Sequence, residues 1–460
     1  MQVNEHIKQQ ILDQYIARTP KSRKLHNDTK VFVPGGDTRA IAHYDPYPFF
    51  AANGKGCFLT DIDGNQYIDC VNNMTANVHG HAHPKILEAI YSQAAVGTNH
   101  SAPVEAQYKL ARHLCERVES IEQIRFCNCG TEATLFTLRA ARAFTGRDLI
   151  IKMDGGYHGG HDAVQANISA DIEAKGLPRT ILNPGVPACT ADGVLIAPYN
   201  DLEAMETILS QNRDKVAAII VEPIFGAGGG AMASFDYLKG LRKLADDHDA
   251  LLIFDEVITL RFHEKGYQAL TGVKPDLTAI GKPIGGGIPV GAFGGRADVM
   301  AVFDHTKPEF VSHSGTFTGN ALTMTAGLAC MENFKQPQID HINALGDRVR
   351  NGIAAAFQKT GVKGSVGGFG SIVYIYFFDQ PFDNGKEFAN LIGTGMNFGH
   401  TMNLALLNQG VFCVAKGILI MVMSTPMDNS IADTIIQRFE KALTIAAPLG
   451  KKHENTCDCI

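Results

Sequence analysis

The chain has 460 residues, of which 45% are hydrophobic and 19% charged, and its formal net charge is -6 at pH 7. A chain of this length and composition can bury more than one core, so we expect at least two domains. The negative charge supplies no basic surface for nucleic acid or anionic lipid, which excludes both as favoured partners. Because no stretch has the apolar length of a membrane span or a secretory signal, we expect a cytoplasmic protein with a small-molecule substrate.

The first 70 residues combine a helix, an irregular stretch rich in Pro and Gly (residues 33–48), and a hairpin. The alternation of apolar and polar residues around Asp63-Gly64 is typical of the two arms of a hairpin. After residue 327 comes a second such mixture, with an expected strand at 371–378 and a terminal helix at 429–446. We expect residues 328–460 to form a small α+β domain that residues 1–70 complete.

Residues 71–327 are expected to form a large α/β domain. Short runs of consecutive apolar residues alternate here with helical patterns, as in a parallel sheet with crossover helices. Both faces of such strands are buried, which explains why apolar residues follow one another without alternation. The expected strands are 148–153, 194–198, 217–221, 250–255 and 277–280, and residues 237–247 are expected to be helical.

A turn that leads into a helix begins at Asn128, and Gly130 and Thr131 open the helical stretch. The first N–H groups of a helix and the positive end of its dipole bind phosphate readily. Alternatively, Thr131 simply caps the helix. Taken alone, this pattern leaves both interpretations open.

Two charged residues follow expected neighbouring strands. Asp255 ends strand 250–255, at the edge where open α/β sheets bind ligands. A carboxylate there either keeps a pyridinium nitrogen protonated or caps a neighbouring helix. Lys282 stands between strand 277–280 and three glycines at 285–287. Because this lysine has little room for solvation, we expect a lowered pKa and an amine that forms an imine with an aldehyde. The phosphate-loop pattern GxxxxGK[ST] does not surround it, and no GxGxxG follows a strand within a βαβ unit.

Eight motifs are spread over roughly residues 30 to 445: PGGDTR (34–39), GHAHP (80–84), NCGTEAT (128–134), GGYHGGHD (155–162), VEPIFGAGG (221–229), FDEVIT (254–259), GKPIGGG (281–287) and SGTFTGN (314–320). In their order and content these motifs resemble those of the class III aminotransferases, which bind pyridoxal 5'-phosphate (PLP) and have the fold type I architecture. The resemblance is strongest to the branch that contains glutamate semialdehyde aminomutase and the β-amino-acid transaminases. It implies a large domain with a mostly parallel central sheet and a smaller α+β domain.

The resemblance also implies roles at matching positions. Lys282 would hold PLP as a Schiff base and carry protons, and Asp255 would pair with the pyridinium nitrogen. Gly130 and Thr131 would bind the phosphate. Thr316 would join them from the other subunit of a homodimer, because the family shares its active sites between two subunits.

Three further residues would surround the cofactor. Tyr157 would stack on one face of the ring, Val257 would pack on the other, and Glu222 would support the pocket. The alternating histidines of GHAHP match a loop of the family, so no metal site is expected.

Two residues of the N-terminal region bear on the amino donor. Arg39 could clamp a substrate carboxylate bidentately, as an arginine at the matching position does in β-amino-acid transaminases, or could be an ordinary surface residue. Met74 would line the same pocket. The aminomutase has Gly-Phe-Arg where this chain has Leu260-Arg261-Phe262, and the aminomutase's tryptophan is absent because the chain has no Trp.

The resulting hypothesis is a transaminase that moves an amino group from an amino acid, with a β-amino acid favoured, to a keto acid such as 2-oxoglutarate. The first alternative is glutamate semialdehyde 2,1-aminomutase, which uses the same site but returns nitrogen to a neighbouring carbon of the same molecule. The second is a tailoring or docking component of a biosynthetic assembly. Retention of Lys282, Asp255 and Thr316 argues against a site without activity.

Overall fold

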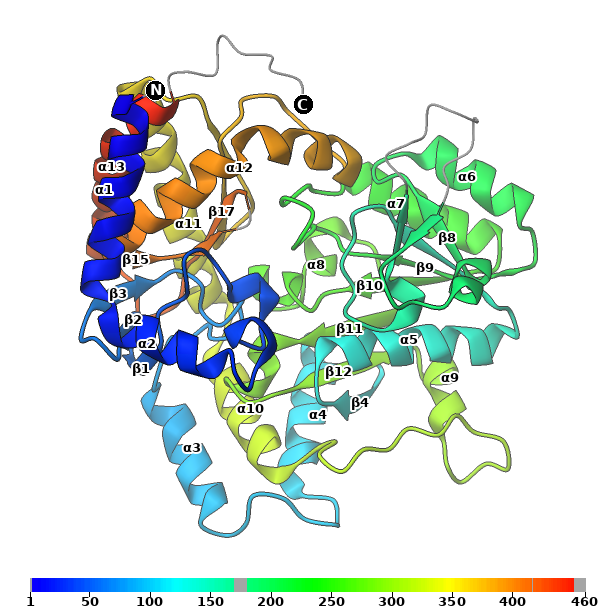
Figure 1. The fold of residues 1–460 in the computed structure, drawn as a ribbon. Helices are drawn as coiled ribbons and strands as arrows, with labels where there is room; N and C mark the ends of the chain where they lie inside the picture. The colour runs from blue at the N-terminus through cyan, green and yellow to red at the C-terminus, as the bar shows by residue number, and fades with distance from the viewer. Residues whose placement is uncertain (1, 169–179, 416, 451–460) are drawn as a thin grey trace. The chain divides into compact units, whose positions relative to one another are not determined.

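The computed structural model describes residues 2–168, 180–415 and 417–450, which divide into two compact units (Figure 1). As far as the described residues reach, unit 1 spans Met1–His83, Asp340–Pro381 and Asn390–Ile460, and unit 2 spans Pro84–Ile339 and Phe382–Ala389. Helices and strands occur in both units, so the chain is an α/β protein as expected. None of the described helices is long and apolar enough to cross a membrane.

Unit 2 is built around a seven-stranded sheet in the order β4-β12-β11-β10-β9-β5-β8. The strands from β11 to β8 are parallel to one another, whereas β12 runs antiparallel to β11 and β4. The sheet is therefore mostly parallel, and the strands expected from apolar runs are confirmed as β5, β8, β9, β10 and β11. The bounds are β4 (Gln123–Cys127), β5 (Leu149–Met153), β8 (Val194–Ala197), β9 (Val216–Val221), β10 (Leu251–Asp255), β11 (Leu277–Gly281) and β12 (Gly291–Gly295).

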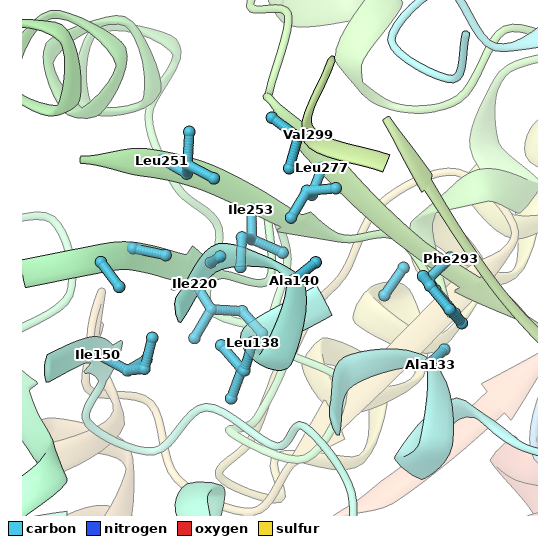
Figure 2. Packing of buried hydrophobic residues seen from close by; sticks show 14 of the residues in the cluster. Ala133, Leu138, Ala140, Ile150, Ile220, Leu251, Ile253, Leu277, Phe293 and Val299 are labelled. Atoms are coloured by element: carbon cyan, nitrogen blue, oxygen red, sulfur yellow. The ribbon is translucent and has the colours of Figure 1, made fainter. Parts of the chain in front are cut away.

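Helix α5 (Gly130–Thr145) packs on one face of this sheet. Its buried residues recur at helical spacing, which gives the helix one apolar face for the sheet to cover. Figure 2 shows part of this core, including Ala133, Leu138 and Ala140 of α5 and Ile150, Ile220 and Ile253 of the strands. Other elements of unit 2 are α3 (Pro84–Ala94), α4 (Glu105–Arg117), the β6 (Ala166–Ile168) and β7 (Thr180–Leu182) pair, α6 (Leu202–Gln211), α7 (Phe235–Asp247), α8 (Gln268–Thr271), α9 (Ala297–Met300) and α10 (Ala321–Asn333).

Strand β12 was not predicted, because its sequence GAFGG lacks the β-branched residues of a typical strand. Its glycines are required by the close approach of neighbouring backbone. A Cβ on Gly291 would collide with the carbonyl oxygen of Cys129, and one on Gly295 with that of Asp276. β12 matters to the site because it lies between β4, which leads to Gly130, and β11, which leads to the lysine at 282.

Unit 1 contains two four-stranded sheets, β1-β2-β3-β15 and β13-β14-β17-β16. The predicted hairpin around Asp63-Gly64 is confirmed as the β2–β3 pair, the predicted strand at 371–378 as β14, and the terminal helix as α13. The strands are β1 (Ala51–Lys55), β2 (Phe58–Asp61), β3 (Gln66–Asp69), β13 (Ser365–Gly367), β14 (Ile372–Tyr376), β15 (Val411–Phe412), β16 (Val414–Ala415) and β17 (Leu419–Val422). The helices are α1 (Gln2–Arg18), α2 (Pro20–Thr29), α11 (Gln336–Thr360), α12 (Gly385–Asn408) and α13 (Asn429–Gly450), of which α11 and α12 begin in unit 2.

The chain passes from one unit to the other after His83 and after Ile339, whereas the boundaries expected from the sequence follow residues 70 and 327. Residues 71–83 are bonded to strands and turns of unit 1. For example, Thr425 N donates to Val78 O over 2.8 Å, and His81 forms a bridge with Gly56. At the other boundary, α10 packs against α3 and α4 and therefore stays with unit 2.

Candidate active site

The segments that follow β4, β10 and β11 meet at one point of unit 2. A Cβ placed on Gly130 would lie 3.1 Å from Val257 Cγ1, and one placed on Gly281 would lie 3.5 Å from the same atom and 3.9 Å from Gly130 Cα. Gly130 is the first residue of α5, Val257 lies two residues beyond Asp255, and Gly281 immediately precedes Lys282. The structure therefore brings together the helix start, the strand-end acid and the lysine.

Lys282 is a partly buried lysine in an unusual backbone conformation. It follows β11 with φ of 51°, in the left-handed region that residues with a side chain rarely adopt. Burial lowers the pKa of its amine to about 8, although Asp255 and Glu222 oppose that shift and Arg261 adds to it. A lysine of this pKa is partly unprotonated near neutral pH and is therefore a competent nucleophile.

Asp255 ends β10 and is 5% exposed. Its Oδ2 lies 2.9 Å from His158 Nδ1, and its Oδ1 accepts a hydrogen bond from Val257 N at 3.1 Å. Burial lowers the pKa of His158, so the neutral ring donates its Nδ1–H to the carboxylate. His158 thus orients Asp255. Sequence reasoning missed this role, although GGYHGGHD contains the histidine.

The start of α5 has no side-chain cap. Its N-cap residue is Cys129, which makes no side-chain capping bond, so the interpretation of Thr131 as the cap is wrong. Instead, Thr131 Oγ1 accepts a hydrogen bond from Gly160 N at 3.2 Å, and a Cβ on Gly159 would lie 2.7 Å from Thr131 Cα. The loop at Gly159 and Gly160 therefore packs directly against the helix start.

Glu222 holds the segment that carries Tyr157. Its Oε1 accepts a hydrogen bond from Tyr157 N at 2.8 Å and its Oε2 accepts one from Gly226 N at 3.0 Å. Burial raises the pKa of Glu222 to about 8, Asp255 adds to the rise, and the two N–H donors and Lys282 oppose it. The Tyr157 side chain is 57% exposed, so its ring is available for contact with a ligand.

Thr316 lies in the exposed segment between α9 and α10. Its carbonyl oxygen accepts a hydrogen bond from Asn99 Nδ2 at 3.0 Å. The preceding residue approaches the site, because a Cβ on Gly315 would lie 3.7 Å from Asn128 Nδ2.

Arg39 and Met74 belong to unit 1, whereas the other candidate residues belong to unit 2. Arg39 is exposed, and its Nη1 donates to Asn73 Oδ1 at 2.7 Å. Met74 is partly buried beside a small apolar pocket. Arg39 is therefore held within unit 1 by a neighbour that sequence reasoning did not identify.

Two fully buried cations of unit 2 were also not assigned to the site. Arg261 follows β10, and burial lowers its pKa to about 9. Lys152 lies in β5, where its Nζ donates to Ala166 O at 2.8 Å and burial lowers its pKa to about 8. Their charges act on Lys282 and His158, respectively. A lysine inside the apolar run of β5 was the available signal for Lys152.

The model of the family "Aminotransferase class-III" matches residues 40–443, so the chain belongs to the class III aminotransferases. Among curated relatives, the glutamate-1-semialdehyde 2,1-aminomutase of Roseiflexus castenholzii is 41% identical over 369 residues, which are 79% of this chain and 84% of that protein. The same enzyme of Methanothrix thermoacetophila is 35% identical over 421 residues, or 91% of this chain and 95% of that protein.

Solved structures show the same architecture. An omega-transaminase from Sphaerobacter thermophilus is 38% identical with a TM-score of 0.87, covering 92% of this chain and 97% of its own. A β-phenylalanine aminotransferase from Variovorax paradoxus is 33% identical with a TM-score of 0.85, covering 95% and 97%. The predicted fold type I is therefore confirmed.

The cofactor of this chain is PLP. Class III aminotransferases depend on it, and a structural relative that is 31% identical, with a TM-score of 0.85 over 94% of this chain and 99% of its own, is described as a transaminase with PLP bound. The residues of unit 2 fit the cofactor chemically. They offer an amine of lowered pKa at Lys282, a buried carboxylate at Asp255 and an uncapped helix start at Gly130.

Proposed function

We propose that the chain is a transaminase that takes the amino group of a β-amino acid and passes it to a keto acid such as 2-oxoglutarate. The observation that carries the amine-transfer part is the juxtaposition of Gly130, Val257 and Gly281, because it gathers the helix start, Asp255 and Lys282 at one point. When bound, PLP supplies an aldehyde that condenses with amines and a ring that accepts electrons from the adjoining carbon.

The site residues divide this work. Lys282 Nζ would hold the cofactor, and its amine of lowered pKa would carry a proton to or from the substrate carbon. The carboxylate of Asp255, oriented by His158, balances the charge of the ring nitrogen. The first N–H groups of α5, at Gly130 and Thr131, hold the phosphate.

Three side chains complete the cofactor pocket in this proposal. Tyr157 would contact one face of the cofactor ring and Val257 the other. Glu222 fixes the backbone of Tyr157 and so keeps the aromatic ring in position. Two copies of the chain form a homodimer that works in the cytoplasm, in which Thr316 of each subunit completes the phosphate site of the other.

The donor assignment depends on Arg39. In a β-amino acid the amine and the carboxylate lie on adjacent carbons, so a guanidinium must bind the carboxylate at a distance from the reacting carbon. Arg39 in the PGGDTR motif is the candidate, and Met74, the second candidate, belongs to the same unit. The β-phenylalanine aminotransferase at 33% identity supports this choice.

The second candidate is glutamate-1-semialdehyde 2,1-aminomutase. The names of the curated relatives, which are 35 to 41% identical, support this reaction better than they support the donor named above. Two features of the sequence argue against the aminomutase. The chain has Leu260-Arg261-Phe262 where the aminomutase has Gly-Phe-Arg, and it contains no Trp. Because both reactions use one cofactor site, only substrates separate them.

A donor and acceptor panel on the purified protein tests both candidates. Formation of glutamate from 2-oxoglutarate with β-phenylalanine supports the transaminase, and no glutamate with any β-amino acid of the panel overturns it. Conversion of glutamate semialdehyde to 5-aminolevulinate without an added acceptor would instead establish the aminomutase. The Lys282→Ala variant is the matched control in both assays.

A further inference from the structure

Arg39 is held at two points. Its Nη1 donates to Asn73 Oδ1 at 2.7 Å, and its backbone N–H donates to Asp37 Oδ1 at 2.9 Å. The second oxygen of Asp37 lies 3.1 Å from His43 Nδ1. The guanidinium is therefore restrained although the residue is exposed, which reduces the entropy that binding an anion would cost.

Asn73 belongs to a left-handed turn of four consecutive residues with side chains, Asn72, Asn73, Met74 and Thr75, whose φ values are 49°, 49°, 54° and 75°. Asn adopts this conformation more readily than other residues with a side chain, but Met and Thr rarely do. A run of four such residues persists only where the surrounding structure imposes it. Here Asn72 Nδ2 donates to Val422 O at 2.7 Å, which ties the turn to β17. The fixed backbone of the turn thus holds the Asn73 side chain where it accepts the hydrogen bond from Arg39.

The two segments also line a common pocket. Ile41 and Ala42, which follow Arg39, and Val71 and Met74, which flank Asn73, line one small pocket together with residues 412–415. The segments that carry Arg39 and Asn73 therefore border the same pocket.

We propose that Asn73 is a specificity-determining residue that prepares Arg39 for a substrate carboxylate. This inference deepens the proposed function and rests on it. A carboxylate binds a guanidinium best through two parallel N–H groups. Because Nη1 of Arg39 is hydrogen-bonded to Asn73, the two parallel N–H groups that would bind the substrate carboxylate are those of Nε and Nη2. The partner is a neutral amide, so it orients Arg39 without neutralising the charge that the substrate needs.

The test compares Asn73→Asp with Asn73→Ala and with Asn53→Asp, which adds the same charge at an exposed position of β1 in the same unit. Binding of 3-phenylpropionate, a carboxylate without an amine, is measured by calorimetry on each PLP-loaded variant. We expect Asn73→Asp to weaken this binding about tenfold or more, because a carboxylate there competes for Arg39, and Asn73→Ala to weaken it about threefold. Asn53→Asp should bind like the wild type.

A second readout separates specificity from general damage. The first half-reaction, followed by the change in cofactor absorbance without any acceptor, is measured with β-phenylalanine and with 1-phenylethylamine, which has no carboxylate. Asn73→Asp should raise the half-saturating concentration of β-phenylalanine and leave that of the plain amine unchanged.

The inference is overturned if the wild type does not bind 3-phenylpropionate or if Asn73→Asp binds it as tightly as the wild type does. It is also overturned if Asn73→Asp raises the half-saturating concentrations of β-phenylalanine and 1-phenylethylamine equally. If the wild type binds 3-phenylpropionate, Asn73→Asp weakens that binding and the wild type still does not react with β-phenylalanine, the proposed donor is refuted and the role of Asn73 stands. The two failures are thus distinguishable.

Discussion

The lowered pKa of Lys282 leads to a direct prediction for the apoenzyme. Burial brings this pKa from 10.5 to about 8. At pH 7 about one lysine in eleven is then unprotonated, against about one in three thousand for an unperturbed lysine, which is a roughly 300-fold larger reactive fraction. The rate at which the apoenzyme captures pyridoxal should therefore rise with pH and level off above pH 8. Pyridoxal is chosen because it lacks the phosphate, whose own titration would interfere.

The assay is stopped-flow absorbance from pH 6 to 10, with borohydride trapping and mass spectrometry to locate the modified residue. The Asp255→Asn variant provides the internal test, because the Asp255 carboxylate raises the pKa of Lys282. Its removal should move the midpoint to lower pH. A midpoint that stays near 10, or trapping on a different lysine, would refute the reasoning.

Three further predictions concern other parts of the molecule. His158→Phe removes a hydrogen bond to a buried carboxylate and should weaken PLP binding about tenfold to a hundredfold in equilibrium dialysis; unchanged affinity would contradict the positioning role. If the proposed homodimer shares its sites, Lys282→Ala and Thr316→Ala subunits, each inactive or impaired alone, should regain activity when they are refolded together, since a hybrid dimer would contain one intact site; a verified hybrid without recovered activity would refute the proposed place of Thr316 in the other subunit's site. Gly291→Ala should lower the free energy of unfolding by about 2 kcal/mol or more, because a Cβ there meets the Cys129 carbonyl. Gly393→Ala, in a helix with open space around it, should raise it by roughly 0.5–1 kcal/mol; equal chemical-denaturation midpoints for the two variants would contradict this account of β12.

The central sheet was predictable because its signal is local. A strand buried on both faces must be apolar at consecutive positions, and residues 217–221 are, so β9 follows from the sequence with little error. For the same reason the ends of β10 and β11, and hence the positions of Asp255 and Lys282 at one edge of the sheet, could be inferred before the fold was known.

Contacts between distant segments were not predictable. His158 and Asp255 are 97 residues apart, and nothing in the local pattern distinguishes this histidine from its neighbours. The hydrogen bond between Arg39 and Asn73 joins residues 34 positions apart in the chain. It also depends on a left-handed turn that contains no glycine, so the usual sequence signal for such a turn is missing. β12 was missed because glycine has a low strand propensity, and its glycines are needed only because neighbouring backbone approaches them closely.

The family, the parallel strands β5, β8, β9, β10 and β11, and the positions of Asp255 and Lys282 at strand ends could all be inferred from the residues alone. Motif order and runs of apolar residues are properties of neighbouring residues, which is why they could be read without the fold. The tertiary structure alone decided which groups orient those residues: His158 for Asp255, Glu222 for the backbone of Tyr157, and Asn73 for Arg39. These hydrogen bonds join residues that are far apart in the chain and meet only in the folded structure. They therefore produce no periodic pattern among neighbouring residues.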